Sequence, residues 1–143
     1  MRYYYLKKRI KLNEGYSTKP YKDQLGHLTI GYGHLILSNE KSFLKKKIHR
    51  KKIEEIFEKD FNTALNQFNK NLKPITSNKK EVELLIEMIF QLGIKNCLKF
   101  NNLLKNMRKG NKYLVCFEMM DSLWYKQTPY RVKNLVKTFL NNE

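Results

Sequence analysis

Leu28-Thr29-Ile30-Gly31-Tyr32-Gly33-His34 is the stretch of the sequence that most constrains the fold. Its β-prone start and its two closely spaced glycines are incompatible with a helix and typical of a short strand that runs into a turn. Before it, Tyr21-Lys22-Asp23 and Gln24-Leu25-Gly26 predict two more short strands, which a glycine turn joins to a strand at residues 27–30. We therefore expect a small, irregular, Gly-rich sheet between residues 16 and 34.

Helical periodicity flanks this sheet on both sides. Residues 3–14 predict a first helix that ends before Gly15, because one helical face carries Tyr3, Leu6, Ile10 and Asn13. The segment 50–69 repeats apolar residues at i, i+3, i+4 and i+7, which predicts a long helix with one buried stripe. Further helical patterns follow, one capped by Asn78 and the last opened by Thr128-Pro129. We expect an α+β fold that is mostly helical.

These elements predict one domain, residues 1–143, that is built from two lobes. The smaller lobe, at about residues 14–50, carries the sheet. The larger lobe, at about residues 70–143, is helical and is joined by the helix at 3–13. The long helix at about residues 51–69 is long enough to bridge the two lobes. A chain of 143 residues has the ordinary size of a single domain.

The net charge of +16, from 29 basic and 13 acidic residues, is the strongest feature of the composition. Such a field attracts polyanions, and both nucleic acids and bacterial cell walls are polyanionic. A genome rich in AT codons is a third explanation, because Lys and Asn are both abundant. The sequence holds no recognised helix-turn-helix, zinc or RNA-binding motif, so we expect no nucleic-acid partner.

Several other classes of protein are excluded by simple patterns. No apolar run approaches the roughly 20 residues that span a bilayer, so we expect no integral membrane segment. The N-terminus lacks an apolar stretch with a cleavage site, so we expect no signal peptide.

Cys97 and Cys116 lie in apolar contexts and predict buried free thiols, with an unsupported disulfide as the alternative. No spacing of Cys and His predicts a metal site, and we expect no cofactor.

Glu14, Asp23 and Thr29 are candidate functional residues. Glu14 lies in the last turn of the first predicted helix, where the negative end of the helix dipole disfavours a carboxylate. Asp23 is unusual in a strand and is typical of a turn, and Thr29 follows in the sheet. Taken singly, each residue also has a plain structural explanation, as a solvated helix end, a turn and a β-prone position.

Two residues farther along the chain, Asp60 and Arg131, are placed less favourably than their chemistry prefers. Asp60 falls inside the apolar stripe of the long helix, and a buried carboxylate needs a partner. We expect a structural pair between Asp60 and His34 that ties the sheet to the helix. Arg131 lies in the first turn of the last helix, where a cation is disfavoured, or is simply a surface residue. Gln91 precedes a glycine at a helix end and either lines a cleft or is exposed.

Taken together, these residues resemble the phage-type lysozymes of glycoside hydrolase family 24. The hallmark of that family is a Glu followed at fixed spacing by an Asp and a Thr, which here are Glu14, Asp23 and Thr29. The resemblance covers nearly the whole chain. It rests on these runs of sequence: Asn13-Glu14-Gly15, Tyr21-Lys22-Asp23, Leu28-Thr29-Ile30-Gly31-Tyr32-Gly33-His34, Phe90-Gln91-Leu92-Gly93 and Trp124-Tyr125-Lys126-Gln127-Thr128-Pro129-Tyr130-Arg131.

The resemblance implies a two-lobed fold with a cleft between the lobes, and it implies a role for each site residue. Glu14 would be the general acid, Asp23 would activate or orient a water, and Thr29 would position that water. Arg131 would lie near Glu14. The substrate-binding residues would be Gln91, Tyr32 and Arg131.

The implied activity is hydrolysis of bacterial peptidoglycan by an endolysin-type muramidase, which acts as a monomer. Its implied location is the host bacterial cytoplasm, from which it reaches the wall after release. Two carboxylates suit glycoside hydrolysis, and a threonine on the water favours inversion. A catalytically inactive wall-binding module and a basic nucleic-acid-binding protein are the alternatives.

The chain also departs from the family pattern. The segment between His34 and the long helix is about ten residues shorter than in T-even relatives, and the C-terminal tail is short. A carboxylate that usually precedes the catalytic Glu is Asn13 here, and a second Arg that usually follows Arg131 by one turn is Asn134. These departures affect expected substrate contacts and leave the catalytic set intact.

Overall fold

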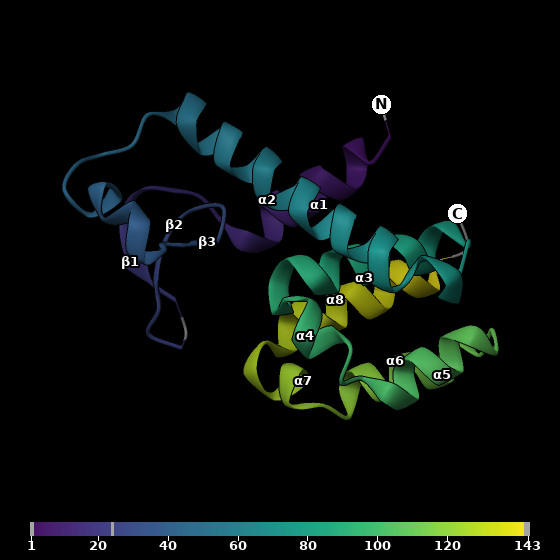
Figure 1. Ribbon diagram of the computed structural model, residues 1–143. Helices are drawn as coiled ribbons and strands as arrows, with labels where there is room; N and C mark the ends of the chain where they lie inside the picture. The colour runs from purple at the N-terminus through teal and green to yellow at the C-terminus, as the bar shows by residue number, and fades with distance from the viewer. Residues whose placement is uncertain (1, 24, 142–143) are drawn as a thin grey trace. The chain divides into compact units, whose positions relative to one another are not determined.

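The computed structural model describes residues 2–23 and 25–141, and it confirms the mostly helical α+β fold (Figure 1). The chain divides into two compact units, one up to Thr63 and one from Ala64 onward, here called the sheet unit and the helical unit. The elements of the sheet unit are α1 (Tyr4–Glu14), β1 (Ser17–Lys22), β2 (Leu28–Gly31), β3 (His34–Leu35), the 3-10 helix η1 (Ser38–Leu44) and the first part of α2 (Arg50–Asn71).

The helical unit contains the end of α2 and every later element. These are the 3-10 helix η2 (Lys73–Ile75), α3 (Lys79–Leu92), α4 (Ile94–Cys97), α5 (Asn101–Arg108), α6 (Lys112–Met120), α7 (Leu123–Gln127) and α8 (Pro129–Leu140). The predicted helices at 3–14 and 50–69 match α1 and α2 to within two residues. Within the described ranges, no helix combines the length and the apolar character that crossing a bilayer requires.

The sheet is antiparallel with strand order β1-β2-β3, so β1 lies at an edge. Tyr21 is opposite Thr29, while Ser17 is opposite Gly31, and the register between these pairs is irregular. Pro20 falls in this irregular part of β1. Proline is tolerated there because an edge strand or a bulge does not need every backbone N–H for the ladder.

The predicted strand at Gln24-Leu25-Gly26 is wrong, because the chain turns there. Gln24 lies outside the described residues, and Leu25 and Gly26 belong to the turn between β1 and β2. The Asp23 carboxylate accepts backbone N–H groups from Leu25 at 2.9 Å and from His27 at 2.8 Å. This short-range bonding is the usual way in which Asp stabilises a turn against a strand.

The apolar core of the sheet unit is small and is shared by strands and helices. Ile30, Ile48 and Ile53 form one buried cluster, and the partly buried side chains around it are those of Tyr32, Ile36 and Phe43. The facing sides of α1 and α2 bury Leu6, Ile10, Phe57 and Phe61.

The helical unit is organised around α3, which contacts α8 and lies beside it in Figure 1. Asn78 caps α3 as predicted, because its side chain accepts the N–H of Glu81 at 3.1 Å. Thr128 is the N-cap residue of α8 and Pro129 opens the helix, both as predicted, but the Thr128 side chain makes no capping hydrogen bond. The Thr128 hydroxyl instead donates to the carbonyl of Trp124 at 3.2 Å. The buried residues of α3 are Leu84, Leu85, Ile86, Glu87, Met88 and Ile89.

Cys97 and Cys116 are both buried and free, which confirms the expected thiols. Burial raises the pKa of the Cys97 thiol to about 12 and also raises the pKa of Cys116. Both thiols are therefore small apolar groups of the core at neutral pH.

Candidate active site

Glu14 is the last residue of α1, and its carboxyl group lies against the backbone of the turn between β2 and β3. A Cβ atom added to Gly33 would stand 2.8 Å from Glu14 Oε1 and 2.9 Å from its Cδ. Gly33 also has a φ of +71°, a conformation that favours glycine. A Cβ atom on Gly31 would instead stand 3.0 Å from Ile53 Cγ2, so Gly33 is the glycine that leaves room for the carboxyl group.

Asp23 and Thr29 meet at one backbone carbonyl in the β1–β2 turn. The His27 carbonyl accepts the Asp23 amide at 2.9 Å and the Thr29 hydroxyl at 2.9 Å. Thr29 is 3% exposed, whereas 37% of the Asp23 side chain is accessible. Because the single hydroxyl proton of Thr29 is donated to His27, the Thr29 oxygen is left as an acceptor.

Tyr21 belongs to the same group of side chains, although the sequence analysis assigned it no role. It lies directly opposite Thr29 in the sheet, and directly opposed residues present their side chains on one face. Burial and the negative charges of Glu14 and Asp23 raise the pKa of the Tyr21 hydroxyl, while a hydrogen bond from the Gly33 backbone lowers it. The alternation of side chains along a strand, with Tyr21 two residues before Asp23, is the pattern that could have indicated this.

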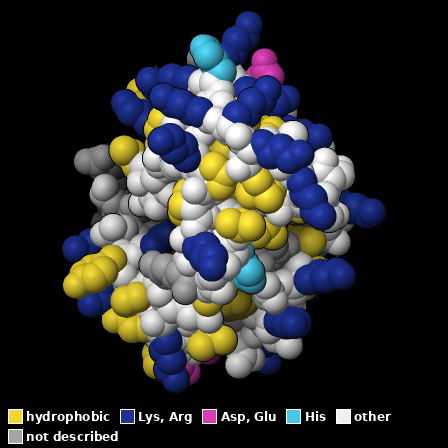
Figure 2. Space-filling model, turned by 90° about the vertical axis from the view of Figure 1, so that its left-hand side faces the viewer, with side chains coloured by type: hydrophobic (Ala, Val, Ile, Leu, Met, Phe, Trp, Pro, Cys, Tyr) yellow, Lys and Arg dark blue, Asp and Glu magenta, His cyan; other side chains and the backbone are white. Residues whose placement is uncertain are grey.

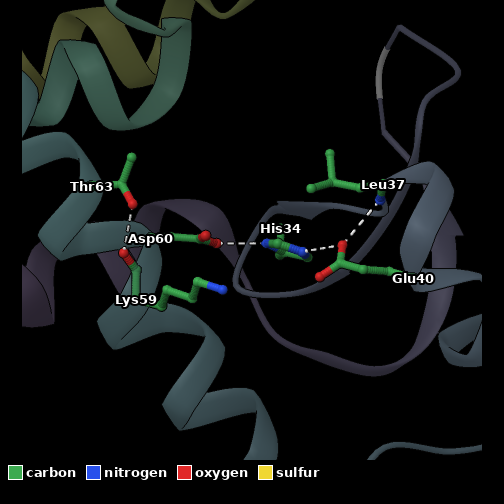
Figure 3. Close-up of polar contacts among 6 residues, drawn as sticks. All are labelled: His34, Leu37, Glu40, Lys59, Asp60 and Thr63. Carbon is green, nitrogen blue, oxygen red and sulfur yellow. Dashed lines mark hydrogen bonds and ion pairs between the residues drawn. The ribbon is translucent and has the colours of Figure 1, made fainter.

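His34 lies between two carboxylates, one on α2 and one on η1 (Figure 3). Its Nδ1 is 2.7 Å from Asp60 Oδ2, the partner that the sequence predicts, and its Nε2 is 2.8 Å from Glu40 Oε1. Glu40 also accepts the backbone N–H of Leu37 at 3.0 Å. The arrangement ties β3 to both helices, and Glu40 is a partner that the sequence analysis missed.

Both contacts favour the charged form of the His34 ring. The hydrogen bond to Asp60 is the largest influence, and together with Glu40 it outweighs burial and raises the pKa of His34 to about 9. Burial alone would raise the pKa of Glu40, but the Leu37 N–H and the His34 charge lower it. His34 is therefore an imidazolium at neutral pH, which suits a structural role and is unsuited to general base catalysis.

Tyr32 packs against α2. Its hydroxyl donates to Glu54 Oε1 at 2.9 Å, and Glu54 is also paired with Lys11 at 2.7 Å. Its ring centroid lies 5.2 Å from that of Tyr16 and 5.5 Å from that of Phe57. These contacts give Tyr32 a packing role, and its binding of substrate stays a prediction.

Gln91 and Arg131 lie in the helical unit, each with partners of its own. Gln91 accepts the indole N–H of Trp124 at 3.0 Å and donates to the Thr128 hydroxyl at 3.3 Å. Arg131 Nη2 is 3.7 Å from Glu87 Oε2, and Glu87 is fully buried on α3. The position of Glu87 inside an apolar run was the available indication of this ion pair. The approach of Arg131 to Glu14 and the binding of substrate by both residues stay predictions.

The described residues do not hold three or more His, Cys, Asp or Glu side chains in an arrangement that would bind a metal ion. The polar side chains that the sheet unit offers around the β1–β2 turn are those of Tyr21, Asp23 and Thr29, and the charge of Glu14 acts on Tyr21. Two carboxylates from different segments, and a threonine hydroxyl that shares the His27 carbonyl with the Asp23 amide, form a set suited to proton donation and water activation.

Residues 11–138 match the phage lysozyme family. The chain is similar to probable T4-type lysozyme 2 of Dictyostelium discoideum, with 30% identity over 94% of this chain and 92% of the relative. Probable T4-type lysozyme 1 of the same organism is 31% identical over 92% of this chain and 91% of its own length. The pre-baseplate central spike protein Gp5 of Enterobacteria phage T4 is 29% identical over 92% of this chain but only 27% of its own length.

Proposed function

The chain belongs to the phage lysozyme family and is a glycoside hydrolase, and from this premise we propose that it cleaves bacterial peptidoglycan. The bond would be the β-1,4 link between N-acetylmuramic acid and N-acetylglucosamine, cut by a single displacement with inversion. The biological role would be that of an endolysin, which lyses the host bacterium from its cytoplasm and requires no cofactor.

Glu14 is the proton donor in this proposal. Its carboxyl group is held against Gly33 at the end of α1, where the helix dipole opposes a negative charge. An acid that must protonate the leaving oxygen benefits from surroundings that disfavour its ionised form. The charges of Glu14 and Asp23 raise the pKa of the Tyr21 hydroxyl, so this hydroxyl is close enough to help orient the Glu14 carboxyl group.

The observation that carries the mechanism is the hydrogen bond from the Thr29 hydroxyl to the His27 carbonyl. With its proton engaged, the Thr29 oxygen accepts one proton of a water, and the partly exposed Asp23 carboxylate accepts the other. Such a water directs a lone pair away from both acceptors and toward a sugar carbon. Direct attack by water gives inversion, for which the two carboxyl groups should stand roughly 6.5–9.5 Å apart.

The stereochemistry of the first product tests this mechanism. We expect proton NMR of a fresh digest of a β-linked oligosaccharide, recorded before mutarotation, to show the α-anomer first. Release of the β-anomer first would mean that Asp23 attacks the sugar itself. Absence of any new reducing ends, on soluble fragments and on walls alike, would overturn the hydrolase activity.

Thr29 offers a matched pair of variants for the water. Thr29→Val removes the hydroxyl and keeps the shape, so kcat should fall by about 100-fold, in the usual range for loss of a catalytic proton contact. Thr29→Ser keeps the hydroxyl and should retain most of the activity. Equal losses in the two variants would contradict the assigned role, because packing and not the hydroxyl would then matter.

A further inference from the structure

Residues 45–52, here called the basic segment, concentrate positive charge on one part of the sheet unit. The segment holds six cations, and every one of them is exposed: Lys45, Lys46, Lys47, Arg50, Lys51 and Lys52. It contains no acidic residue. Figure 2 shows a face of the molecule on which Lys and Arg side chains far outnumber acidic ones.

The basic segment is anchored to the sheet unit. Ile48, in its middle, is 6% exposed and packs with Ile30 and Ile53 in the apolar cluster. The backbone N–H of Ile48 donates to the carbonyl of Thr18 on β1 at 2.9 Å. The cations on both sides of Ile48 are therefore presented from a fixed backbone, which lowers the entropy lost when a ligand binds.

The cations at the start of α2 lie where they lower the stability of the folded protein. Arg50, Lys51 and Lys52 form the first turn of α2, which has no acidic residue. The partial positive charge of a helix N-terminus repels cations, so the helix dipole adds to the field of the segment. Glu55 lies 4.0 Å from Lys52, but both side chains are more than half exposed and screening makes such a pair weak.

The basic segment also lies close to the residues that directly follow Glu14, the proposed proton donor. The guanidinium of Arg50 lies 5.7 Å from the ring centroid of Tyr16, and Tyr16 follows Glu14 by two residues. Tyr16 is 45% exposed, so the cationic surface continues into an exposed aromatic ring beside β1. A polymer engaged by the segment would thus be held near the proposed proton donor.

We propose that residues 45–52 are a docking site for phosphate groups of polymers that are attached to the bacterial cell wall. The inference rests on the proposed function, because it assumes that the wall is the substrate. Closely spaced cations match a linear polymer with a charge in each repeat better than the more widely spaced carboxylates of stem peptides. Such docking would raise the local concentration of the substrate and would be sensitive to salt.

Binding to purified walls tests the site, with Glu14→Gln in every protein so that the walls are not digested. The variant K45Q/K46Q/K47Q removes three charges and leaves Ile48 in place. The matched control, K105Q/R108Q/K109Q, removes three exposed charges from α5 and the residue after it. We expect the first variant to lower affinity for teichoic acid-bearing walls by about tenfold at 0.1 M salt, and the control by less than about threefold.

Hydrofluoric acid removes phosphate-linked polymers from walls and leaves the glycan. Binding to these stripped walls shows whether the basic segment recognises phosphate or stem-peptide carboxylates. On them we expect the parent protein to bind more weakly and the difference between the two triple variants to vanish. A difference that persists would overturn the choice of phosphate in favour of stem-peptide carboxylates. Equal losses for the two variants on untreated walls would mean that net charge, and not the segment, carries binding.

Binding to short duplex DNA, at the same phosphate concentration, tests whether the basic segment is a nucleic-acid site. Loss of DNA affinity without loss of wall affinity in K45Q/K46Q/K47Q would overturn the proposal in favour of a nucleic-acid site. If circular dichroism shows that this variant is unfolded, K51Q/K52Q decides instead. It should weaken wall binding and raise the Tm, because it removes cations from a helix N-terminus.

Release of reducing ends from stripped walls, by the protein with Glu14 intact, tests the proposed function separately. If reducing ends are released from stripped walls while K45Q/K46Q/K47Q binds walls normally, only the docking site is contradicted. Binding that follows the segment without any release of reducing ends would sink only the proposed hydrolysis.

Discussion

The sheet unit and the helical unit use polar side chains in different ways. In the sheet unit, ion pairs link neighbouring elements at partly exposed positions, as in Lys7–Glu58 at 2.8 Å and Lys11–Glu54 at 2.7 Å. In the helical unit, apolar side chains fill the interior and Glu87 is the one buried carboxylate among the described residues. The difference indicates that the sheet unit is organised to position charged groups and the helical unit to supply apolar burial.

The largest effect should follow from breaking the chemistry of the sheet unit without altering its packing. Glu14→Gln keeps the shape of the side chain and removes the acid, so kcat on walls should fall by about 10³-fold or more. The Tm should change little, because Glu14 lies at a helix end outside the apolar core. Reducing-end assays and thermal unfolding measure the two quantities.

A folded Glu14→Gln protein with near-normal activity would remove the proton donor from the mechanism. Tyr5→Phe is a suitable control, since Tyr5 lies on the same helix, is 79% exposed and has no assigned role in catalysis.

The opposite pattern is expected in the helical unit. Leu85 is fully buried on α3, and Leu85→Ala removes apolar contacts and leaves a cavity. Its free energy of unfolding should fall by about 3 kcal/mol, with kcat of the folded protein nearly unchanged. Leu123→Ala, at a position that is 68% exposed, is the control and should cost far less. Urea unfolding measures both variants. Similar losses of unfolding free energy in Leu85→Ala and Leu123→Ala would contradict an apolar core around α3.

A smaller and pH-dependent effect should arise from the His34 cluster of the sheet unit. The folded pKa of His34 is raised to about 9, above the unfolded value of about 6.5. Its contribution to stability is therefore complete below about pH 6.5 and is lost as the pH rises through about 9. We expect the difference in unfolding free energy between the parent and His34→Asn to shrink by about 2–3 kcal/mol between pH 6 and pH 10.

Glu40→Gln separates the two carboxylates of the cluster. The folded pKa of Glu40 is lowered, so its contribution is present above the unfolded pKa of about 4.3 and is lost as the pH falls through the folded value. This variant should reduce the His34 effect without abolishing it, because Asp60 makes the largest contribution. A pH-independent difference between the parent and His34→Asn in urea unfolding would show that the ring is not charged by its partners.

Much of this architecture could be predicted from local patterns. The stripe that includes Phe57 and Phe61 predicts α2, and Gly15 and Pro129 mark helix boundaries that the structure confirms. The strand predicted at residues 24–26 failed because the Asp23 side chain bonds backbone groups two and four residues ahead and so turns the chain. A short apolar or mixed segment does not by itself reveal such bonding.

The partners of the charged residues depended on the tertiary structure. Asp60 could be paired with His34 from the sequence because a carboxylate in an apolar stripe requires a partner and the resemblance to the family implies the same pair. Glu40, Glu54 and Tyr21 could not be assigned in this way, because each lies in a segment that tolerates a solvated polar residue. Their contacts arise only when η1, α2 and β1 are brought against the rest of the sheet unit.

The sequence by itself determined the fold class and the family, and it predicted Glu14, Asp23 and Thr29 as the catalytic residues, because helical periodicity, glycine placement and motif spacing are local properties of the chain. Only the tertiary structure decided that Glu14 rests against Gly33 and that His34 lies between the carboxylates of Asp60 and Glu40. Those features depend on distances between segments remote in sequence, and a hydrogen bond or ion pair is set by such distances to within a fraction of an ångström.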